Sequence, residues 1–193
     1  EVEQTFPNKS FIKLVEGTQE AESELKRITS RTSGTVQEKA IKVVKDILSN
    51  LDIESYITSF EIAAVNYIDN EGLLMAPAYA VSEMLKKQNL NLQDFDFYEI
   101  HEAFAAQTLA TINAWKSEEF CKSKLGREKV MGSFDHNKLN VKGGSLAIGH
   151  PFAATGARIV ATLSKLLKDN GGGKGLISIC TAGGMGITAI LER

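Results

Sequence analysis

The sequence has 193 residues, of which 43% are hydrophobic and 24% are charged, and its formal net charge at pH 7 is −2. This composition is typical of a globular protein, and the length allows one compact domain but not two large ones. The near-neutral charge argues against nucleic-acid binding, and no apolar run approaches the roughly 18 residues that a membrane span needs.

The first section of the chain, residues 1–50, predicts a leader made of a strand and helices. Residues 11–15 form a β-branched run that favours a strand, and residues 19–28 favour a helix. Residues 35–49 predict a second helix, because their apolar side chains recur at helical spacing. Residues 54–68 are rich in β-branched and aromatic side chains, which predicts a strand.

The second section, residues 51–193, goes on to alternate helices and strands. Pro77 suits the first turn of a helix, and residues 92–100 predict a turn that leads into a short strand. Residues 101–115 predict the helix that follows this strand. A polar, lysine-rich loop is then expected over residues 116–139.

The end of the chain predicts one helix followed by two strands. The helix is expected to start after Pro151 and to end at the glycine-rich residues 170–175. Residues 176–180 and 186–192 predict strands that are neighbours in one sheet, around the glycine turn TAGGM. The alternation predicts an α/β fold, in which helices flank a layered, mixed β-sheet.

Three places at predicted strand ends and helix starts carry reactive side chains, and α/β proteins tend to place catalytic groups there. In the first place, His101 lies where a strand leads into a helix, and Glu102 is expected in the first turn of that helix, where the helix dipole favours an anion. A histidine there can donate to a carbonyl oxygen or hold a water molecule. The alternative is a capping or core histidine, which the spacing by itself favours.

The second place is the segment GGSLAIGHP, which is expected to present His150 at the N-terminus of a helix. Gly149 would relax the turn before His150, and Pro151 would fix the chain direction after it. A helix N-terminus favours the neutral imidazole, the form that accepts a proton. The alternative is a phosphate-binding turn, which is disfavoured because the residue order of nucleotide-binding loops is absent.

The third place is Cys180, which ends an apolar strand and runs directly into a glycine turn. Backbone N–H groups after Cys180 could bind a developing oxyanion while the thiol carries a proton. A buried structural cysteine is the alternative, and the pattern does not decide between the two. No close cysteine and histidine pairing has the spacing of a zinc site, so no metal is expected.

Four segments together resemble the C-terminal half of the thiolase family, in the family's order and at similar distances. They are GLLMAPAYA (72–80), HEAFAAQ (101–107), NVKGGSLAIGHPFAATGAR (140–158) and CTAGGMG (180–186). The resemblance runs from about Tyr56 to Arg193, whereas residues 1–50 match poorly. It implies that residues 51–193 form the C-terminal domain of a thiolase-like fold.

The resemblance also implies a reaction, which is thiolytic cleavage of 3-ketoacyl-CoA or the reverse Claisen condensation. Coenzyme A and acyl-CoA would be substrates, and no cofactor is expected. Cys180 would take or give a proton at the α-carbon or the leaving thiol, and a thiol base needs a lowered pKa. His150 would activate the nucleophile and, with a bound water, stabilise the thioester enolate, and His101 would hold that water. The backbone at Ala182 and Gly183 would contribute to an oxyanion hole.

Two departures from the commonest thiolase pattern indicate which type of thiolase the chain resembles. His101 stands where most members have asparagine, and Ala182 stands where most have glycine. Both look like the β-subunit type of fatty-acid-oxidation thiolase. This implies a partner hydratase/dehydrogenase subunit. The family resemblance further implies a homodimeric parent protein, located in the cytoplasm of a bacterium or, if the source is eukaryotic, in the mitochondrial matrix.

The cysteine that thiolases acylate has no counterpart in this sequence. Cys121 lies in the charged context EEFCKSKLG and is expected to be a surface or half-buried loop cysteine. We therefore expect a C-terminal domain that supplies the acid/base and oxyanion-hole half of a site and is inactive without the N-terminal thiolase half. The alternative is a non-catalytic thiolase-like module that binds acyl-CoA or a partner protein.

Overall fold

A four-stranded β-sheet organises residues 55–193, which are the residues that the computed structural model describes. The elements, with η for a 3-10 helix, are β1 (Tyr56–Ala64), η1 (Tyr67–Asp69), α4 (Ala76–Gln88), β2 (Phe97–Ile100), α5 (Ala105–Lys116), α6 (Glu118–Ser123), η2 (His136–Lys138), α7 (Ser145–Ile148), α8 (Thr155–Asp169), β3 (Lys174–Thr181) and β4 (Met185–Glu192). The predicted strand at 11–15 and the predicted helices at 19–28 and 35–49 lie outside the described residues.

The sheet is mixed, as predicted, and its strand order is β1-β4-β3-β2. β2 and β3 run parallel, with Ile100 opposite Ser178, whereas β3 and β4 run antiparallel, with Cys180 opposite Gly186. A tight turn is enough to join the antiparallel pair, but the parallel pair needs a long crossover, which runs through helices α5 to α8. The carboxyl ends of β2 and β3 therefore meet at the same edge of the sheet.

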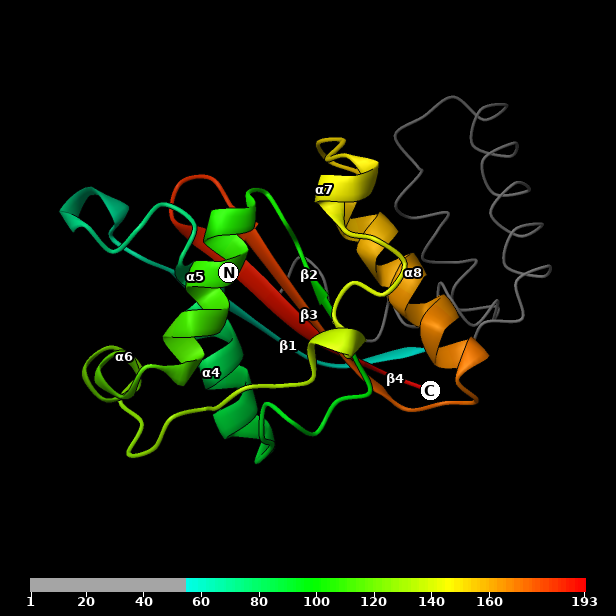
Figure 1. The fold of residues 1–193 in the computed structure, drawn as a ribbon, viewed down its shortest axis with the longest axis horizontal. Coiled ribbons are helices and arrows are strands. Elements are labelled where there is room, and N and C mark those ends of the chain that lie inside the picture. Colours follow the sequence, from blue (N-terminus) through cyan, green and yellow to red (C-terminus); the bar gives the residue numbers. More distant parts are fainter. Residues whose placement is uncertain (1–54) are drawn as a thin grey trace, which may run out of the picture. The chain divides into compact units, whose positions relative to one another are not determined.

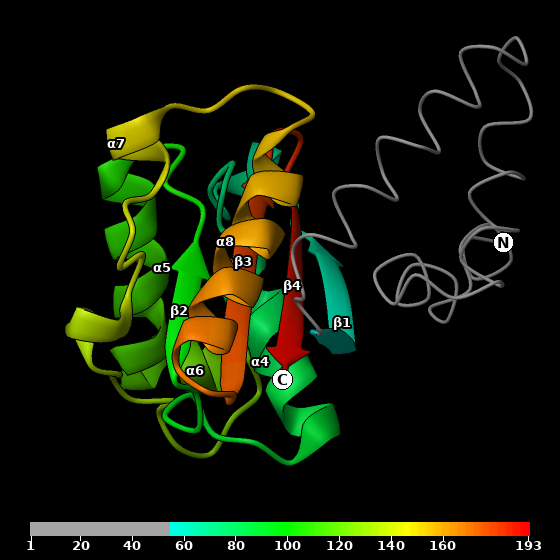
Figure 2. The ribbon, with the colours of Figure 1, turned by 90° about the vertical axis from the view of Figure 1, so that its right-hand side faces the viewer.

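Helices cover both faces of the sheet, with α4 and α5 on one face and α8 on the other (Figure 1). Figure 2 shows α8 lying along β2, β3 and β4. Because side chains alternate along a strand, Ile100 and Leu176 are buried with α4 and α5, whereas Ile177 and Leu191 are buried with α8. None of the helices found in residues 55–193 is long and apolar enough to cross a membrane.

Two helices start later than predicted. α5 begins at Ala105 rather than at residue 101, because the backbone N–H of His101 still donates to the carbonyl of Ser178 and continues the pairing of β2 with β3. α8 begins at Thr155 rather than directly after Pro151, and the short helix α7, which the sequence did not predict, precedes it. Both candidate catalytic histidines consequently lie in loops and not in the first turn of a helix.

The polar segment 116–139, predicted as a loop, contains the helix α6 and the 3-10 helix η2. Ser117 caps α6, because its side chain accepts a hydrogen bond from the backbone N–H of Phe120 at 3.1 Å. Cys121 is fully buried, with its sulfur 3.4 Å from the carbonyl oxygen of Trp115. The prediction of a surface or half-buried loop cysteine is wrong, because the helix turns the sulfur inward and the charged neighbours outward.

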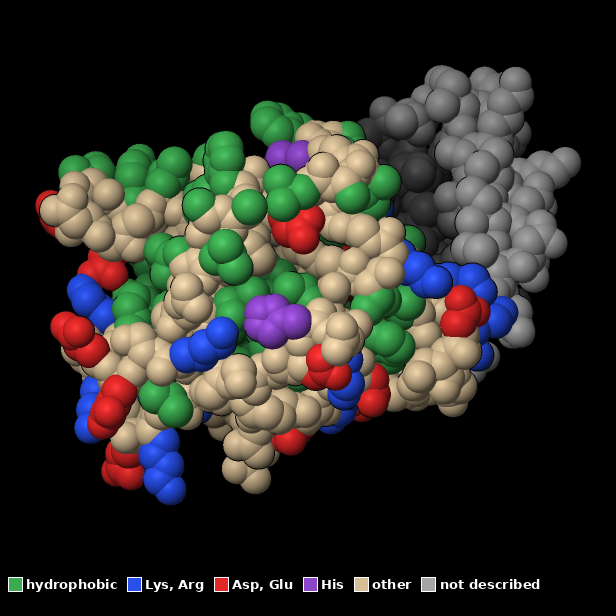
Figure 3. Space-filling model, viewed as in Figure 1, with side chains coloured by type: hydrophobic (Ala, Val, Ile, Leu, Met, Phe, Trp, Pro, Cys, Tyr) green, Lys and Arg blue, Asp and Glu red, His purple; other side chains and the backbone are tan. Residues whose placement is uncertain are grey.

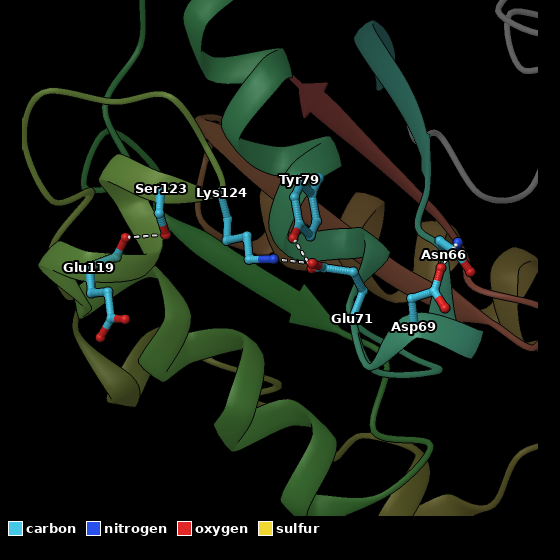
Figure 4. A network of polar contacts seen from close by, with 7 residues as sticks. All are labelled: Asn66, Asp69, Glu71, Tyr79, Glu119, Ser123 and Lys124. Carbon is cyan, nitrogen blue, oxygen red and sulfur yellow. Dashed lines mark hydrogen bonds and ion pairs between the residues drawn. The ribbon is translucent and has the colours of Figure 1, made fainter.

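Polar contacts fasten the segment that leads from β1 into α4 (Figure 4). The Glu71 carboxylate accepts a hydrogen bond from the Tyr79 hydroxyl of α4 at 2.5 Å, and it pairs with Nζ of Lys124, just after α6. The bond to Lys124 is the main reason that the pKa of Glu71 is lowered. Burial and the bond to Glu71 both raise the pKa of Tyr79. Three separate stretches of chain are joined in this way.

Candidate active site

The loop after β2 carries His101, whose side chain is almost completely buried. Its Nδ1 atom lies 2.9 Å from the Oγ atom of Ser145, the first residue of α7. Burial, and then the nearby charges of His150 and Arg158, lower the pKa of His101 to about 4. The imidazole of His101 is therefore neutral at pH 7.

His150 lies in the loop between α7 and α8 and meets His101 there. The two imidazole rings are 4.3 Å apart, measured between their centroids. The Nδ1 atom of His150 lies 2.7 Å from the Oγ1 atom of Thr155, the first residue of α8, and the ring of Phe152 packs against the imidazole at 4.7 Å. His150 itself is exposed, in contrast to His101. Two of the three predicted catalytic side chains are thus in contact.

A half-buried arginine supports this pair of histidines. Arg158, in the first turn of α8, donates from Nη2 to the Oγ atom of Ser145 at 2.9 Å. Its charge acts to lower the pKa of Glu99 in β2, a residue that is buried with 1% of its surface exposed. Burial raises the pKa of Glu99 to about 7, and the attraction of Arg158 opposes that shift. The site therefore contains a half-buried cation near a buried acid whose pKa is raised to about 7.

Glu102 fixes the loop that carries His101. Its Oε1 atom accepts from Nδ2 of Asn140 at 2.8 Å, and its Oε2 atom accepts from the backbone N–H of Leu146 at 3.1 Å. The amide of Asn140 also forms two hydrogen bonds with the backbone of Ile100, both 2.9 Å long, as a neighbouring strand would. The prediction that Glu102 lies in the first turn of the helix at 101–115 is wrong. Its carboxylate binds an N–H group of α7 instead.

Cys180 lies in β3, one residue before its end, and is buried. Its sulfur lies 3.5 Å from Oε1 of Gln107 in α5. Burial raises the pKa of the thiol, although backbone N–H groups of Cys180 itself and of Ala103 act in the opposite direction. The pKa of the Cys180 thiol is therefore not lowered as a thiol base needs, because burial outweighs the nearby donors. The thiol is protonated at neutral pH.

The turn after Cys180 holds the backbone groups predicted for an oxyanion hole. Ala182 and Gly183 are exposed and lie between β3 and β4. Gly184, with φ of 74°, accepts a hydrogen bond on its carbonyl from the backbone N–H of Val65 at 2.8 Å. The left-handed φ favours glycine, and a Cβ atom there would lie 2.5 Å from the carbonyl oxygen of Val65. The turn is therefore anchored to the end of β1.

The structure brings the predicted site residues to one edge of the sheet. His101 and His150 touch directly, and Cys180 lies on the strand next to His101, with its thiol near the backbone of Ala103. The residues that hold the two rings could not be singled out from the sequence, although they lie inside the segment 140–158. They are Ser145, Thr155 and Arg158. Their only signal in the sequence is that they are polar residues in a glycine-rich segment. The path of the loops decides which histidine ring each of them contacts.

A family model described as the C-terminal domain of thiolase matches residues 51–193 of the chain. This chain belongs to the thiolase family. Within the part of the thiolase chain that the structure describes, no cluster of three or more His, Cys, Asp or Glu side chains could hold a metal ion.

Curated relatives of the thiolase chain carry the same family name. A 3-ketoacyl-CoA thiolase of Shewanella putrefaciens is 47% identical over 137 residues, which are 71% of this chain and 31% of the relative. A 3-ketoacyl-CoA thiolase of Shewanella baltica matches with the same identity and the same coverage. The chain therefore spans less than a third of the length of these relatives.

Solved thiolase structures share the fold of this chain. An acetyl-CoA acetyltransferase of Bacillus anthracis is 35% identical, with a TM-score of 0.56 over 72% of this chain and 30% of that one. The peroxisomal 3-ketoacyl-CoA thiolase of Saccharomyces cerevisiae is also 35% identical, with a TM-score of 0.56 over 77% of this chain and 38% of that one. The yeast structure is described as five layers, built from two core domains of identical topology. The predicted thiolase-like α/β fold is confirmed.

Proposed function

We propose that this thiolase chain supplies the acid/base and oxyanion-hole half of an acyl-CoA C-acyltransferase. The enzyme would cleave 3-ketoacyl-CoA with coenzyme A, or join two acyl-CoA thioesters in the reverse direction. The observation that carries the proposal is the contact of the His101 and His150 rings, 4.3 Å apart, beside the strand that carries Cys180 near its end. Two imidazoles and a thiol at one sheet edge are suited to moving protons and holding an oxyanion.

The difficult step in this chemistry is the charge that develops on the thioester oxygen when the carbon–carbon bond breaks. Hydrogen-bond donors aimed at that oxygen stabilise the enolate, and the loss of one such donor typically costs about 3 kcal/mol. A neutral imidazole, such as that of His101, can donate without giving up its proton. We assign His101 to this role, together with a water that it would hold and the backbone of Ala182 and Gly183.

Cys180 would act as the acid that ends the cleavage step. When the carbon–carbon bond breaks, the electron pair stays with the thioester enolate, and the proton of the Cys180 thiol goes to the α-carbon. The resulting thiolate then takes the proton of the incoming coenzyme A thiol, whose sulfur attacks the acyl group held on the enzyme. The raised pKa of Cys180 suits the first of these steps, because the thiol enters the reaction protonated.

The acyl group would be held by a cysteine from another part of the enzyme. Cys121 does not suit this role, because it is fully buried and its sulfur lies 3.4 Å from the carbonyl of Trp115. His150 would activate the acylated cysteine, since its ring is exposed while that of His101 is not. The other half of the enzyme would therefore approach the edge of the sheet where His150 lies.

An apolar patch at this edge supports the same arrangement. The patch consists of side chains that are between 56% and 65% exposed, and its members are Phe104, Leu109, Leu146 and Ile148. Figure 3 shows hydrophobic side chains gathered over the start of α5 and over α7. Exposed apolar patches mark sites of interaction with proteins, membranes or ligands. We propose that a second α/β core domain, like the two that build the yeast relative, covers it.

The identity of two residues supports an assignment to fatty acid oxidation. His101 and Ala182 resemble the residues at these positions in the β-subunit type of fatty-acid-oxidation thiolase. We therefore propose 3-ketoacyl-CoA as the substrate and a hydratase/dehydrogenase subunit as a partner. The names of the Shewanella relatives agree with that substrate.

A chimera tests the proposed function. In the Shewanella putrefaciens thiolase, the matching C-terminal segment is replaced by residues 57–193 of this chain, which form one compact unit. We expect the chimera to release acetyl-CoA from a 3-ketoacyl-CoA in a manner that depends on coenzyme A. Cys180→Ala and His150→Ala should each lower kcat by at least about 100-fold, as loss of an acid or base does. His136→Gln, at an exposed histidine outside the site, is the matched control and should keep full turnover.

Other results of this experiment would contradict the assigned roles or the proposed function. Near-normal kcat in Cys180→Ala or His150→Ala contradicts the assigned roles. A folded chimera without turnover that still binds acyl-CoA supports a non-catalytic module and contradicts the proposal. The 193-residue chain by itself should show no turnover, because it offers no suitable cysteine for acylation.

A further inference from the structure

A buried chain of hydrogen bonds holds His101 from the side of the ring that carries Nδ1. Nη2 of Arg158 lies 2.9 Å from Oγ of Ser145, and this oxygen lies 2.9 Å from Nδ1 of His101. Ser145 is 7% exposed and His101 is 2% exposed, so water competes little for these bonds. The three residues come from α8, α7 and the loop after β2. The chain of bonds therefore forms only in the folded domain.

The protons in this chain of bonds follow from the chemistry of the groups. A guanidinium group can only donate, so the Ser145 oxygen accepts from Arg158. Among the described residues, Nδ1 of His101 is the other hydrogen-bond neighbour of Ser145 Oγ, and the hydroxyl has one proton to give. If Nδ1 carried a proton instead, the serine proton would be buried without an acceptor, at a cost of about 1–3 kcal/mol.

We propose that Ser145 and Arg158 are positioning residues that fix His101 as the imidazole with its proton on Nε2 and its lone pair on Nδ1. The low pKa of His101, about 4, agrees with a single proton on the ring at pH 7. The positive charge of Arg158 favours both the tautomer and the low pKa of His101. It polarises the serine hydroxyl that donates to Nδ1, and it opposes a second proton on the ring.

The fixed tautomer gives the site a donor at a defined atom. The second nitrogen of an imidazole carries the proton that the first one lacks, so a bond at Nδ1 decides what Nε2 presents. An Nε2–H group can donate to a thioester oxygen or to a water beside it, whereas an Nε2 lone pair would repel a developing oxyanion. The tautomer itself follows from the hydrogen bonds alone, and its use in catalysis rests on the proposed function.

Nitrogen NMR of the full 193-residue chain tests the tautomer directly. The sequence has three histidines, so labelling the imidazole nitrogens with nitrogen-15 gives a spectrum that His101→Asn and His136→Gln can assign. At pH 7, we expect Nε2 of His101 to show the signal of a protonated nitrogen and Nδ1 that of an unprotonated one. Ser145→Ala should shift the Nδ1 signal and mix the two tautomers, and Ser145→Thr, which keeps the hydroxyl, should restore the original pattern.

Ser178→Ala is the matched control, because Ser178 is as deeply buried as His101 and its hydroxyl has no hydrogen-bond partner among the described residues. This variant should leave the His101 signals unchanged. A proton on Nδ1 in the wild-type chain overturns the proposal, as does a doubly protonated ring at pH 7. A wild-type pattern in folded Ser145→Ala overturns it as well. If Ser145→Ala does not fold, the wild-type spectrum decides alone.

Kinetics of the Ser145 variants test whether the serine positions a catalytic ring, and they do so separately from the tautomer itself. In an active chimera, Ser145→Ala should lower kcat about tenfold with little change in KM, and Ser145→Thr should restore it. An unchanged kcat would show that the serine does not position a catalytic ring. An inactive chimera with the expected NMR pattern would overturn the proposed function and leave the tautomer assignment intact.

Discussion

The Nδ1 atom of His150 and the Oγ1 atom of Thr155 lie 2.7 Å apart, and the same oxygen donates to the carbonyl of Pro151 at 3.1 Å. A carbonyl oxygen can only accept, so the threonine gives its one proton to Pro151 and accepts from His150. A neutral His150 therefore carries its proton on Nδ1 and has a lone pair on Nε2. The two touching rings are therefore held by opposite hydrogen-bond patterns, since Nδ1 of His101 accepts from Ser145 whereas Nδ1 of His150 donates to Thr155.

The first prediction concerns Thr155. Thr155→Val removes the acceptor of the His150 proton, so we expect kcat of the chimera to fall about tenfold, the effect of losing one hydrogen bond of about 1 kcal/mol or slightly more. Thr155→Ser keeps the hydroxyl and should retain most of the turnover. Steady-state kinetics at pH 8 measures both variants. Equal turnover in Thr155→Val and the wild type would mean that Thr155 does not orient the ring.

The second prediction concerns two pKa shifts that oppose each other. The pKa of Glu99 rises from 4.5 to about 7, so between these pH values the folded state holds a proton that the unfolded state has lost, and stability falls as pH rises. The pKa of His101 falls from 6.5 to about 4, so the unfolded state holds the extra proton, and stability rises with pH. Each shift corresponds to roughly 3 kcal/mol in the free energy of unfolding. His150, Arg158 and Glu102 supply the charges that act on these groups.

We therefore expect the free energy of unfolding of the wild type to change little between pH 4.5 and pH 6.5, because the two slopes cancel there. Glu99→Gln should reveal stability that rises with pH, and His101→Asn should reveal stability that falls with pH. Urea unfolding followed by the fluorescence of Trp115, the one tryptophan in the sequence, measures these slopes. The change of the free energy of unfolding with pH is compared, and not its absolute value, because either substitution can also change the overall stability. Parallel curves for the three proteins would contradict the shifts.

The third prediction concerns the space at Gly144. A Cβ atom there would collide with the carboxylate of Glu102 and would lie 2.7 Å from Nδ2 of Asn140. Gly144→Ala should therefore break the bonds of Glu102 to Asn140 and to Leu146, and lower the free energy of unfolding by about 1–3 kcal/mol. Gly156→Ala is the control, because Gly156 lies in α8 with open space at its Cβ position. It should be neutral or stabilise by up to about 1 kcal/mol. Equal stabilities in urea would contradict the steric argument.

The fourth prediction concerns Ala153, in the loop that presents His150. Its φ of 66° lies in the left-handed region, which costs a residue with a Cβ about 1 kcal/mol relative to glycine. Ala153→Gly should therefore raise the midpoint of urea unfolding. Ala154→Gly serves as the comparison, because Ala154 has φ of −109° and gains nothing from glycine. It should lower the midpoint or leave it unchanged. A lower midpoint for Ala153→Gly would show that the chain entropy of glycine outweighs the strain.

Much of the fold could be predicted because its elements have local signals. The apolar stripe of α8 and the glycine-rich stop after it lie where the sequence pattern indicated. The final two strands pair as neighbours around the TAGGM turn, also as predicted. The starts of α5 and α8 could not be predicted, since they depend on a bond from His101 to β3 and on the path of the loop after Pro151. Those are contacts between distant parts of the chain.

The sequence by itself determined the family of this chain and the reactive side chains that it offers, because reactive residues next to glycine turns are a local pattern and the family motifs preserve it. The tertiary structure alone decided how each reactive group is held. Ser145, Thr155 and Arg158 become partners of His101 and His150 only when α7 and α8 fold against the end of β2. Burial likewise sets the protonation of His101, Glu99 and Cys180. Desolvation depends on everything that surrounds a group, and no short stretch of sequence contains that information.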